Sequence, residues 1–164
     1  MLLVTYGSRH GATREIAEEI AKTFRGRGVG VDIRSALEVE SVEEFDGVVL
    51  GSAIYNGRLH GDAIRFLERH RRALSAKTLA VFVAGPRDLD PDSVLHSKIQ
   101  ALHGLRGFRE LEPVSMAVFG GVIDPDVLRW PFSRMQPSDA RDWDDIRSWA
   151  LGLIDSPVFQ CAIV

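Results

Sequence analysis

The sequence predicts an α/β fold in which a doubly wound, five-stranded parallel sheet carries helices on both faces. Short apolar runs alternate with amphipathic helical patterns along the chain, and this alternation is the main structural signal. No repeat, low-complexity tract or linker interrupts it. The 164 residues suit a single domain with a substantial core. Parallel strands joined by right-handed helical crossovers form a sheet of this kind.

The first half of the chain supplies three strands and two helices. The first helix has apolar residues at i, i+4 and i+8 and ends at two glycines. The second has a basic outer face, which we expect to be solvated, although docking of an acidic partner stays open. The strands are expected at 2–6, 29–35 and 47–53, and the helices at 12–28 and 65–74.

The second half adds two strands and two helices. A proline lies in the first turn of the third helix and a glycine follows its end. An apolar stripe that begins at Trp143 defines the fourth helix. The strands are expected at 78–85 and 113–121, and the helices at 91–104 and 139–154.

The composition indicates a soluble globular domain at residues 1–155, followed by a C-terminal tail at 156–164. No apolar run approaches the roughly 18 residues of a membrane span, and no leader sequence is visible at the start. The single cysteine, Cys161, excludes an internal disulfide and fits a reducing compartment. The net charge of −3 gives no reason to expect a nucleic-acid partner. We therefore expect a cytoplasmic protein without a transmembrane segment, and its oligomeric state stays open.

The histidines of the predicted helices do not indicate a metal site. His60, His70, His96 and His103 fall on helical patterns without the spacing of metal ligands. We expect solvated or capping roles for them.

Loops of unusual composition follow three of the predicted strands, at 7–13, 51–60 and 84–90. Doubly wound sheets bind ligands beyond the carboxyl ends of their strands. In the first loop, GSRHGAT, small residues precede a helix N-terminus, where unpaired N–H groups and hydroxyl or cationic side chains can hold a phosphate. The alternative is a plain turn from strand to helix that Ser8 caps.

Two common phosphate-binding loops are excluded. A Walker loop needs a Gly-Lys pair, and the chain contains none. The dinucleotide fingerprint needs three glycines, whereas only Gly7 and Gly11 are present in this loop.

The stretch VTYGSRHGATREIAEEI, residues 4–20, resembles the flavodoxin signature. Thr5 departs from it, because an apolar residue is usual there. The stretch GSAIYNGRLHGDAIRFLERH resembles the flavin-contacting loop of one branch, the flavodoxin-domain proteins related to menaquinone-dependent protoporphyrinogen oxidase. The stretches AVFGGVIDPDVL and RDWDDIRSWA resemble the end of the same branch. The resemblance implies the strand order 2-1-3-4-5. The matching signature residues are Ser8, Gly11, Thr13, Ala17 and Ile20.

The same resemblance implies FMN as cofactor and assigns its contacts. Since the flavin carries the chemistry, no catalytic side chain is expected. The implied phosphate contacts are Ser8, Arg9, His10, Gly11, Ala12 and Thr13. The implied contacts to the isoalloxazine ring are Ser52, Ala53, Ile54, Tyr55, Asn56 and Gly57, together with Ala84, Gly85, Pro86, Arg87 and Asp88.

Physical reasons support these ring contacts. A flavin ring is a flat apolar surface with polar edges, which needs walls and backbone donors. Ile54 and Tyr55 offer a wall, and the Asn56-Gly57 pair favours a turn that exposes a peptide group. The alternative for Tyr55 is a surface aromatic that rests on the helix of residues 58–72.

Several functions stay open at this stage. The resemblance to the proteins related to menaquinone-dependent protoporphyrinogen oxidase implies oxidation of protoporphyrinogen or a similar reduced substrate, with a quinone as acceptor. A one-electron carrier with a redox-protein partner is the alternative, and so is a binding module without flavin. A phosphoryl-accepting receiver domain would need an aspartate after the third strand, where the chain has VLGSA.

The segment 124–139 is much shorter than the insertion in the oxidase itself. Its apolar stretch 127–135 could meet a porphyrinogen, a quinone or a membrane surface. Ordinary packing over the edge of the sheet is the other interpretation.

Overall fold

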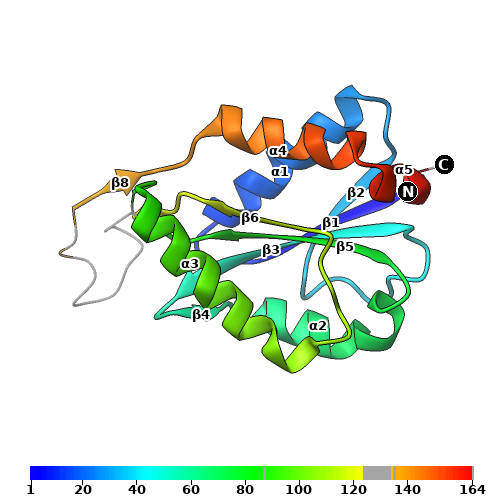
Figure 1. The fold of residues 1–164 in the computed structure, drawn as a ribbon, viewed down its shortest axis with the longest axis horizontal. Coiled ribbons are helices and arrows are strands. Elements are labelled where there is room, and N and C mark those ends of the chain that lie inside the picture. Colours follow the sequence, from blue (N-terminus) through cyan, green and yellow to red (C-terminus); the bar gives the residue numbers. More distant parts are fainter. Residues whose placement is uncertain (87, 124–133, 135, 164) are drawn as a thin grey trace.

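The computed structural model describes residues 1–86, 88–123, 134 and 136–163. Its main sheet consists of five parallel strands in the spatial order β2-β1-β3-β5-β6 (Figure 1). A short strand, β4 (Arg58–Leu59), pairs antiparallel with the end of β3. Without β4 the order is the predicted 2-1-3-4-5. The five strands are β1 (Leu2–Gly7), β2 (Val31–Ser35), β3 (Gly47–Tyr55), β5 (Thr78–Ala84) and β6 (Ser115–Phe119).

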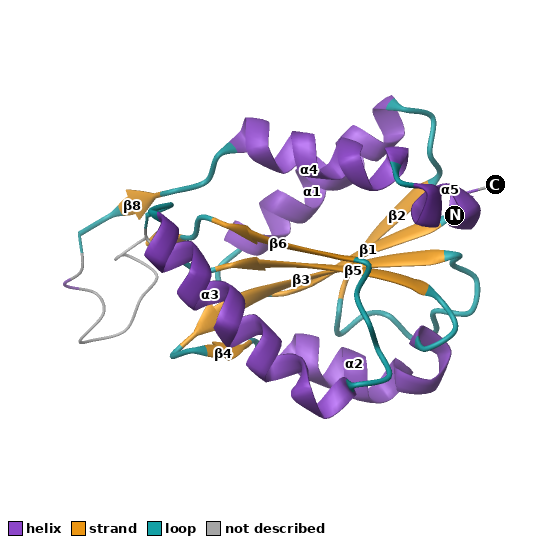
Figure 2. Cartoon of the chain, in the orientation of Figure 1, coloured by secondary structure: helices purple, strands orange, loops and turns teal. Residues whose placement is uncertain are grey.

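Helices cover both faces of this sheet, as the sequence predicts (Figure 2). One face carries α1 (Ala12–Gly26), α4 (Trp143–Asp155) and α5 (Pro157–Ile163). The other carries α2 (Gly61–Leu74) and α3 (Pro91–Gly104), followed by the 3-10 turn η1 (Leu105–Phe108).

Burial of apolar side chains explains why α1 forms. Ile16, Ile20 and Phe24 lie on one side of the helix and are fully buried, which confirms the predicted stripe. On the strand beneath, Leu3 faces the α2 side, whereas Val4 faces α1. This alternation gives each face of the sheet its own core.

An aromatic cluster joins α4 to the edge of the sheet. The Phe82 ring lies 5.8 Å from Phe119 and 6.2 Å from Trp149, measured between centroids. The Trp149 Nε1 donates a hydrogen bond of 3.0 Å to Ser115 Oγ. The cluster therefore anchors β6, which has a neighbouring strand on one side only.

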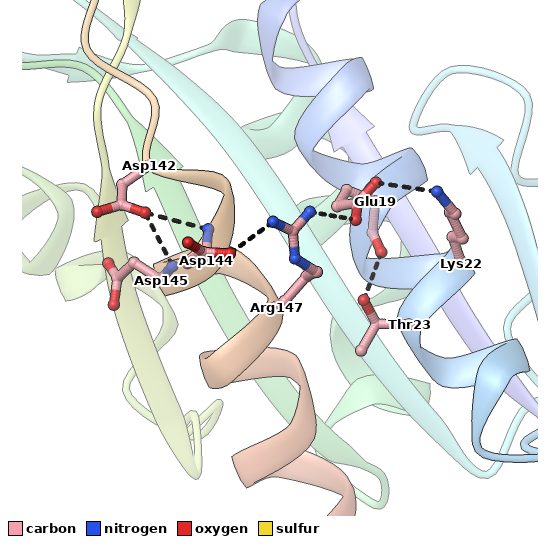
Figure 3. Close-up of polar contacts among 7 residues, drawn as sticks. All are labelled: Glu19, Lys22, Thr23, Asp142, Asp144, Asp145 and Arg147. Carbon is pink, nitrogen blue, oxygen red and sulfur yellow. Dashed lines mark hydrogen bonds and ion pairs between the residues drawn. The ribbon is translucent and has the colours of Figure 1, made fainter.

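Ion pairs link α4 to α1 (Figure 3). Arg147 contacts Glu19 on α1 at 2.9 Å and Asp144 on its own helix at 2.7 Å. The Asp142 carboxylate accepts from the N–H groups of Asp144 and Asp145 and so caps α4. This cap explains why α4 begins at Trp143 and not at residue 139, as the sequence suggests.

The structure adds short elements that the sequence does not predict. Besides β4 and η1, an antiparallel pair joins β7 (Val122–Ile123) to β8 (Ser138–Asp139). The apolar stretch 127–135 lies outside the described residues except for position 134.

Most of the segment 156–164, expected to be a C-terminal tail, forms a helix. Residues 157–163 form α5, and Phe159 is fully buried in the core beneath α1 and α4. Among the helices that the structure describes, none has the length and apolar character needed to cross a membrane.

We expect the substitution Phe159→Ala to lower the free energy of unfolding by about 3–5 kcal/mol, because it leaves a cavity in the core. Urea unfolding followed by circular dichroism measures this. The half-exposed neighbour Val158 is the control, and Val158→Ala should change the value by less than about 0.5 kcal/mol. Equal and small effects of both substitutions would show that α5 does not stabilise the domain.

Candidate functional site

Parallel pairing brings the three predicted loops to one edge of the sheet. Gly7 at the end of β1 is paired with Ser52 on β3, and Ala53 is paired with Ala84 at the end of β5. The segments that follow these positions therefore leave the sheet side by side. Arg87, a predicted ring contact, lies outside the described residues.

The first loop ends in a helix N-terminus that no side chain caps. Gly11 is the N-cap residue of α1 and has a φ of 84°, a left-handed conformation that favours glycine. Its carbonyl accepts from Glu15 N at 3.0 Å. The helix cap that the alternative interpretation assigns to Ser8 is therefore absent among the described residues, where Gly11 is the N-cap residue.

The backbone donors of this loop have no acceptor among the described residues. In the part of the chain that the structure describes, no backbone N–H from Ser8 to Arg14 donates to another protein group. Arg9 and His10 are exposed, whereas Thr13 is buried in the first turn. Such a cluster of free donors at the positive end of a helix suits an anion.

The second loop is a tight hairpin between β3 and β4. Asn56 and Gly57 both have left-handed conformations, with φ of 49° and 73°. This confirms the turn chemistry that the Asn-Gly pair predicts. Tyr55 is paired with Arg58 across the turn.

Ser52 shapes this hairpin from within the protein. Its buried hydroxyl donates to Ala53 O at 2.9 Å and accepts from His60 N at 2.9 Å. His60 in turn caps α2, since its Nδ1 accepts from Asp62 N at 3.2 Å. The capping role expected for His60 is thus confirmed, and the Ser52 hydroxyl ties the end of β3 to the start of α2.

The Tyr55 ring lies between the rings of His10 and His60. Its contact with His10 connects the second loop to the first. Its ring centroid is 5.9 Å from that of His10 and 6.0 Å from that of His60, both in edge-on contact. The Tyr55 side chain is partly exposed, at 38%. Burial raises the pKa of its phenol, against the opposing effect of the Arg9 charge. The phenol therefore stays protonated at neutral pH.

This grouping was missed by reasoning from the sequence. The sequence assigns His10 to the phosphate loop, and it places His60 at the end of the loop 51–60 without a contact to the flavin. The signal available for His60 was its position five residues after Tyr55, across the Asn-Gly turn.

The third loop packs against the second. A Cβ atom on Gly85 would lie 3.1 Å from the Ile54 Cβ, so the absence of a side chain lets the two loops approach. Pro86 is buried, and its carbonyl accepts from Gly121 N at 2.8 Å. Asp88 is exposed. The described parts of the three loops thus lie at one edge of the sheet, with Ile54 close to Gly85 of the third loop and Tyr55 in contact with His10 of the first.

A separate depression of about 430 Å³ lies at the opposite edge, beside the end of α2. Arg69, His70 and Lys77 line it together with Glu40 and Glu43. It is remote from the three loops, because α2 starts at the carboxyl ends of the strands and finishes at their amino ends.

His70 corrects the expectation of a solvated role. It is only 7% exposed, its Nε2 is 3.1 Å from Val39 O, and its ring lies 4.9 Å from that of Phe66. Burial lowers the pKa of His70, the hydrogen bond to Val39 opposes this, and Arg69 reinforces it.

The chain is similar in sequence to a known family and to several curated proteins. The sequence profile of a family described as flavodoxin domain matches residues 3–135. The protoporphyrinogen IX dehydrogenase [quinone] of Escherichia coli K12 is 29% identical over 82 residues, which cover 49% of this chain and 45% of that protein. The match thus spans about half the length of these curated relatives. A bifunctional cytochrome P450/NADPH–P450 reductase of Acremonium egyptiacum is 27% identical over 159 residues, 93% of this chain and 14% of that protein.

Solved structures share the fold. Oxidised flavodoxin 2 of Bacillus cereus superposes with a TM-score of 0.61 at 21% identity, covering 92% of this chain and 94% of that one. A short-chain flavodoxin associated with a bacterial microcompartment gives 0.60 at 16% identity, covering 99% of each chain.

We expect His70 to contribute to acid sensitivity of the fold. In the unfolded chain its pKa returns to about 6.5, so below that pH the unfolded state binds a proton that the folded state does not. Stability is therefore lost as the pH falls from about 6.5 toward the folded pKa. His70→Gln keeps a donor for Val39 O but does not titrate, so the pH dependence of the unfolding free energy should become shallower.

The slope should decrease by at most about 1.4 kcal/mol per pH unit, the value for one proton. Urea unfolding between pH 5 and 8 measures it. His96→Gln, at an exposed position of α3, is the matched control and should keep the wild-type slope. An unchanged slope in His70→Gln would contradict the assignment.

Proposed function

The chain belongs to the flavodoxin domain family, and on that premise we propose that it binds FMN where its three loops meet and uses the flavin for oxidation and reduction. The observation that carries the proposal is the row of free backbone donors from Ser8 to Arg14 at the start of α1. These donors suit a phosphate dianion without further rearrangement.

The residues around this place fit the rest of the cofactor. Ser8 and Thr13 would offer hydroxyl donors to the phosphate, and Arg9 a positive charge. Ile54 and Tyr55 would bound the ring, and the loops around Gly57 and Gly85 would bring peptide groups to its edge. Bound FMN supplies the electron transfer, so the protein needs only to bind it, orient it and exclude water.

For the substrate, we propose a reduced organic molecule of the porphyrinogen class with a quinone as acceptor. Each turnover would remove two electrons and two protons from the substrate and convert the quinone to a quinol. Support comes from the likeness to the E. coli dehydrogenases, which covers about half of either chain.

One-electron transfer to a redox protein is the second candidate. The flavodoxins of known structure support it, because they match this fold over nearly the whole chain. The mild net charge of −3 supports the enzyme instead, since carriers that dock on basic partners gain from a stronger acidic charge.

Titration of the apoprotein into FMN should quench the flavin fluorescence at micromolar protein, and Thr13→Ala should weaken the affinity about tenfold or more. The variant removes a hydroxyl whose hydrogen bond to a charged group is worth roughly 1.5–3 kcal/mol. Riboflavin lacks the phosphate, so it should bind the wild type and the variant alike.

Thr13→Ser, which keeps the hydroxyl, is the matched control and should stay close to the wild type. A thermal melt of each variant checks that the buried position still packs. If neither quenching nor a shift of the flavin absorption bands appears, the proposed function fails.

The FMN-loaded protein should consume protoporphyrinogen IX faster with menadione present than without it, as measured by the fluorescence of the porphyrin product. Its reductive titration should show a single two-electron phase, because an enzyme of this kind need not stabilise a state between the two. Two separate one-electron phases without porphyrinogen turnover would favour the carrier. Free FMN at the same concentration is the control for uncatalysed oxidation.

A further inference from the structure

Helix α3 presents its large apolar side chains to solvent and its small ones to the sheet. Ser97 and Ala101 are buried, and a Cβ on Gly104 would lie 2.8 Å from the Leu59 side chain. These small residues let α3 approach β4 closely. Leu95 and Ile99 on the outer side are more than half exposed, at 55% and 54%.

The other long helices do not share this arrangement. In α1 the large apolar residues Ile16, Ile20 and Phe24 are buried, and in α2 so are Phe66 and Leu67. A helix that keeps its aliphatic side chains on the outside leaves apolar area without a partner in the described structure.

Three of these outer residues form a stripe suited to a second helix. Leu95, Ile99 and Leu102 are spaced four and three residues apart, and Leu102 is 50% exposed. This is the d-a-d spacing of paired helices, with isoleucine at a and leucine at d. The stripe is self-complementary about a point between Lys98 and Ile99, because a two-fold axis there opposes position 95 to position 102.

The charges at the two ends of α3 are opposite, which selects the direction of a pair. The beginning of the helix carries exposed acidic residues, and the first charged residues beyond its end are basic. An antiparallel pair therefore places unlike charges together at both ends, whereas a parallel pair places like charges together. The acidic residues are Asp88, Asp90 and Asp92, and the basic ones are Arg106 and Arg109; the Glu110 that follows is paired with Arg71 of α2.

We propose that this face of α3, defined by Leu95, Ile99 and Leu102, binds a second copy of the chain. The two α3 helices pack antiparallel about a two-fold axis that passes between Lys98 and Ile99. Leu95 packs against Leu102 of the partner subunit. Such an isologous contact uses the same surface on both subunits, so it closes at a dimer.

Sedimentation velocity of the full chain tests the proposal. The wild type should shift from a species of 18.2 kDa to one of twice that mass as its concentration rises. Ile99→Asp places two like charges at the centre of the contact and should raise the dissociation constant by about 30-fold or more. Because Ile99 is exposed, the variant should melt like the wild type.

Leu37→Asp is the matched control. Leu37 is 58% exposed in the turn after β2, away from α3, so its substitution should leave the dimer intact. A wild type that stays monomeric at every concentration overturns the proposal, and so does a dimer that Leu37→Asp weakens as much as Ile99→Asp does.

Disulfide trapping tests the orientation, in a Cys161→Ser background. Ile99→Cys should cross-link under mild oxidation. Leu95→Cys alone should not, because the two copies of residue 95 would be about 10 Å apart along the helices, beyond disulfide reach. A mixture of the Leu95→Cys and Leu102→Cys proteins should cross-link to each other. Cross-linking of Leu95→Cys by itself, or none at Ile99→Cys, would overturn the antiparallel pair.

Discussion

Parallel pairing of β1, β3 and β5 is the constraint on which the remainder of the molecule depends. Strands that run in the same direction cannot be joined by a tight turn, so each must be followed by a crossover that returns the chain to the starting edge. The helices between them are those crossovers, and they bury both faces of the sheet. Because these strands run in the same direction, their carboxyl ends lie at one edge of the sheet. The register pairs Gly7 with Ser52 and Ala53 with Ala84, so the three strands end at nearly the same level. The candidate site is thus a result of strand direction before any side chain is considered.

Much of this architecture could be predicted from the sequence, because long periodic segments carry their own signal. The limits of α3 agree with the prediction, and α1 differs only at its end, which is Gly26 and is followed by the left-handed Gly28. The short elements could not be predicted, since a two-residue strand such as β4 has too few positions to show a period. Helix α5 depends on Phe159 reaching a core that is assembled from distant parts of the chain.

The candidate site, like the fold, could be predicted only in part from the sequence. The turn at Asn56 could be predicted from local chemistry, and the three loops from composition and resemblance. The partners of His70 and Tyr55 could not, because each contact joins residues that are far apart in the sequence or lie across a turn: Val39 is 31 residues from His70, and His10 precedes Tyr55 by a helix and two strands. Periodicity reports which side of an element is buried, but not what lies against it.

The bond network at Ser52 has a mechanical consequence. The hydroxyl of Ser52 and the carbonyl of Ala53 both accept from His60 N, and the His60 carbonyl accepts from the first turn of α2. The base of the hairpin that carries Tyr55 is therefore hydrogen-bonded to the N-cap residue of α2, so the hairpin and the helix do not move independently at this point. A shift of the hairpin backbone is therefore transmitted to the start of α2, a helix of 14 residues whose other end lies at the opposite edge of the sheet.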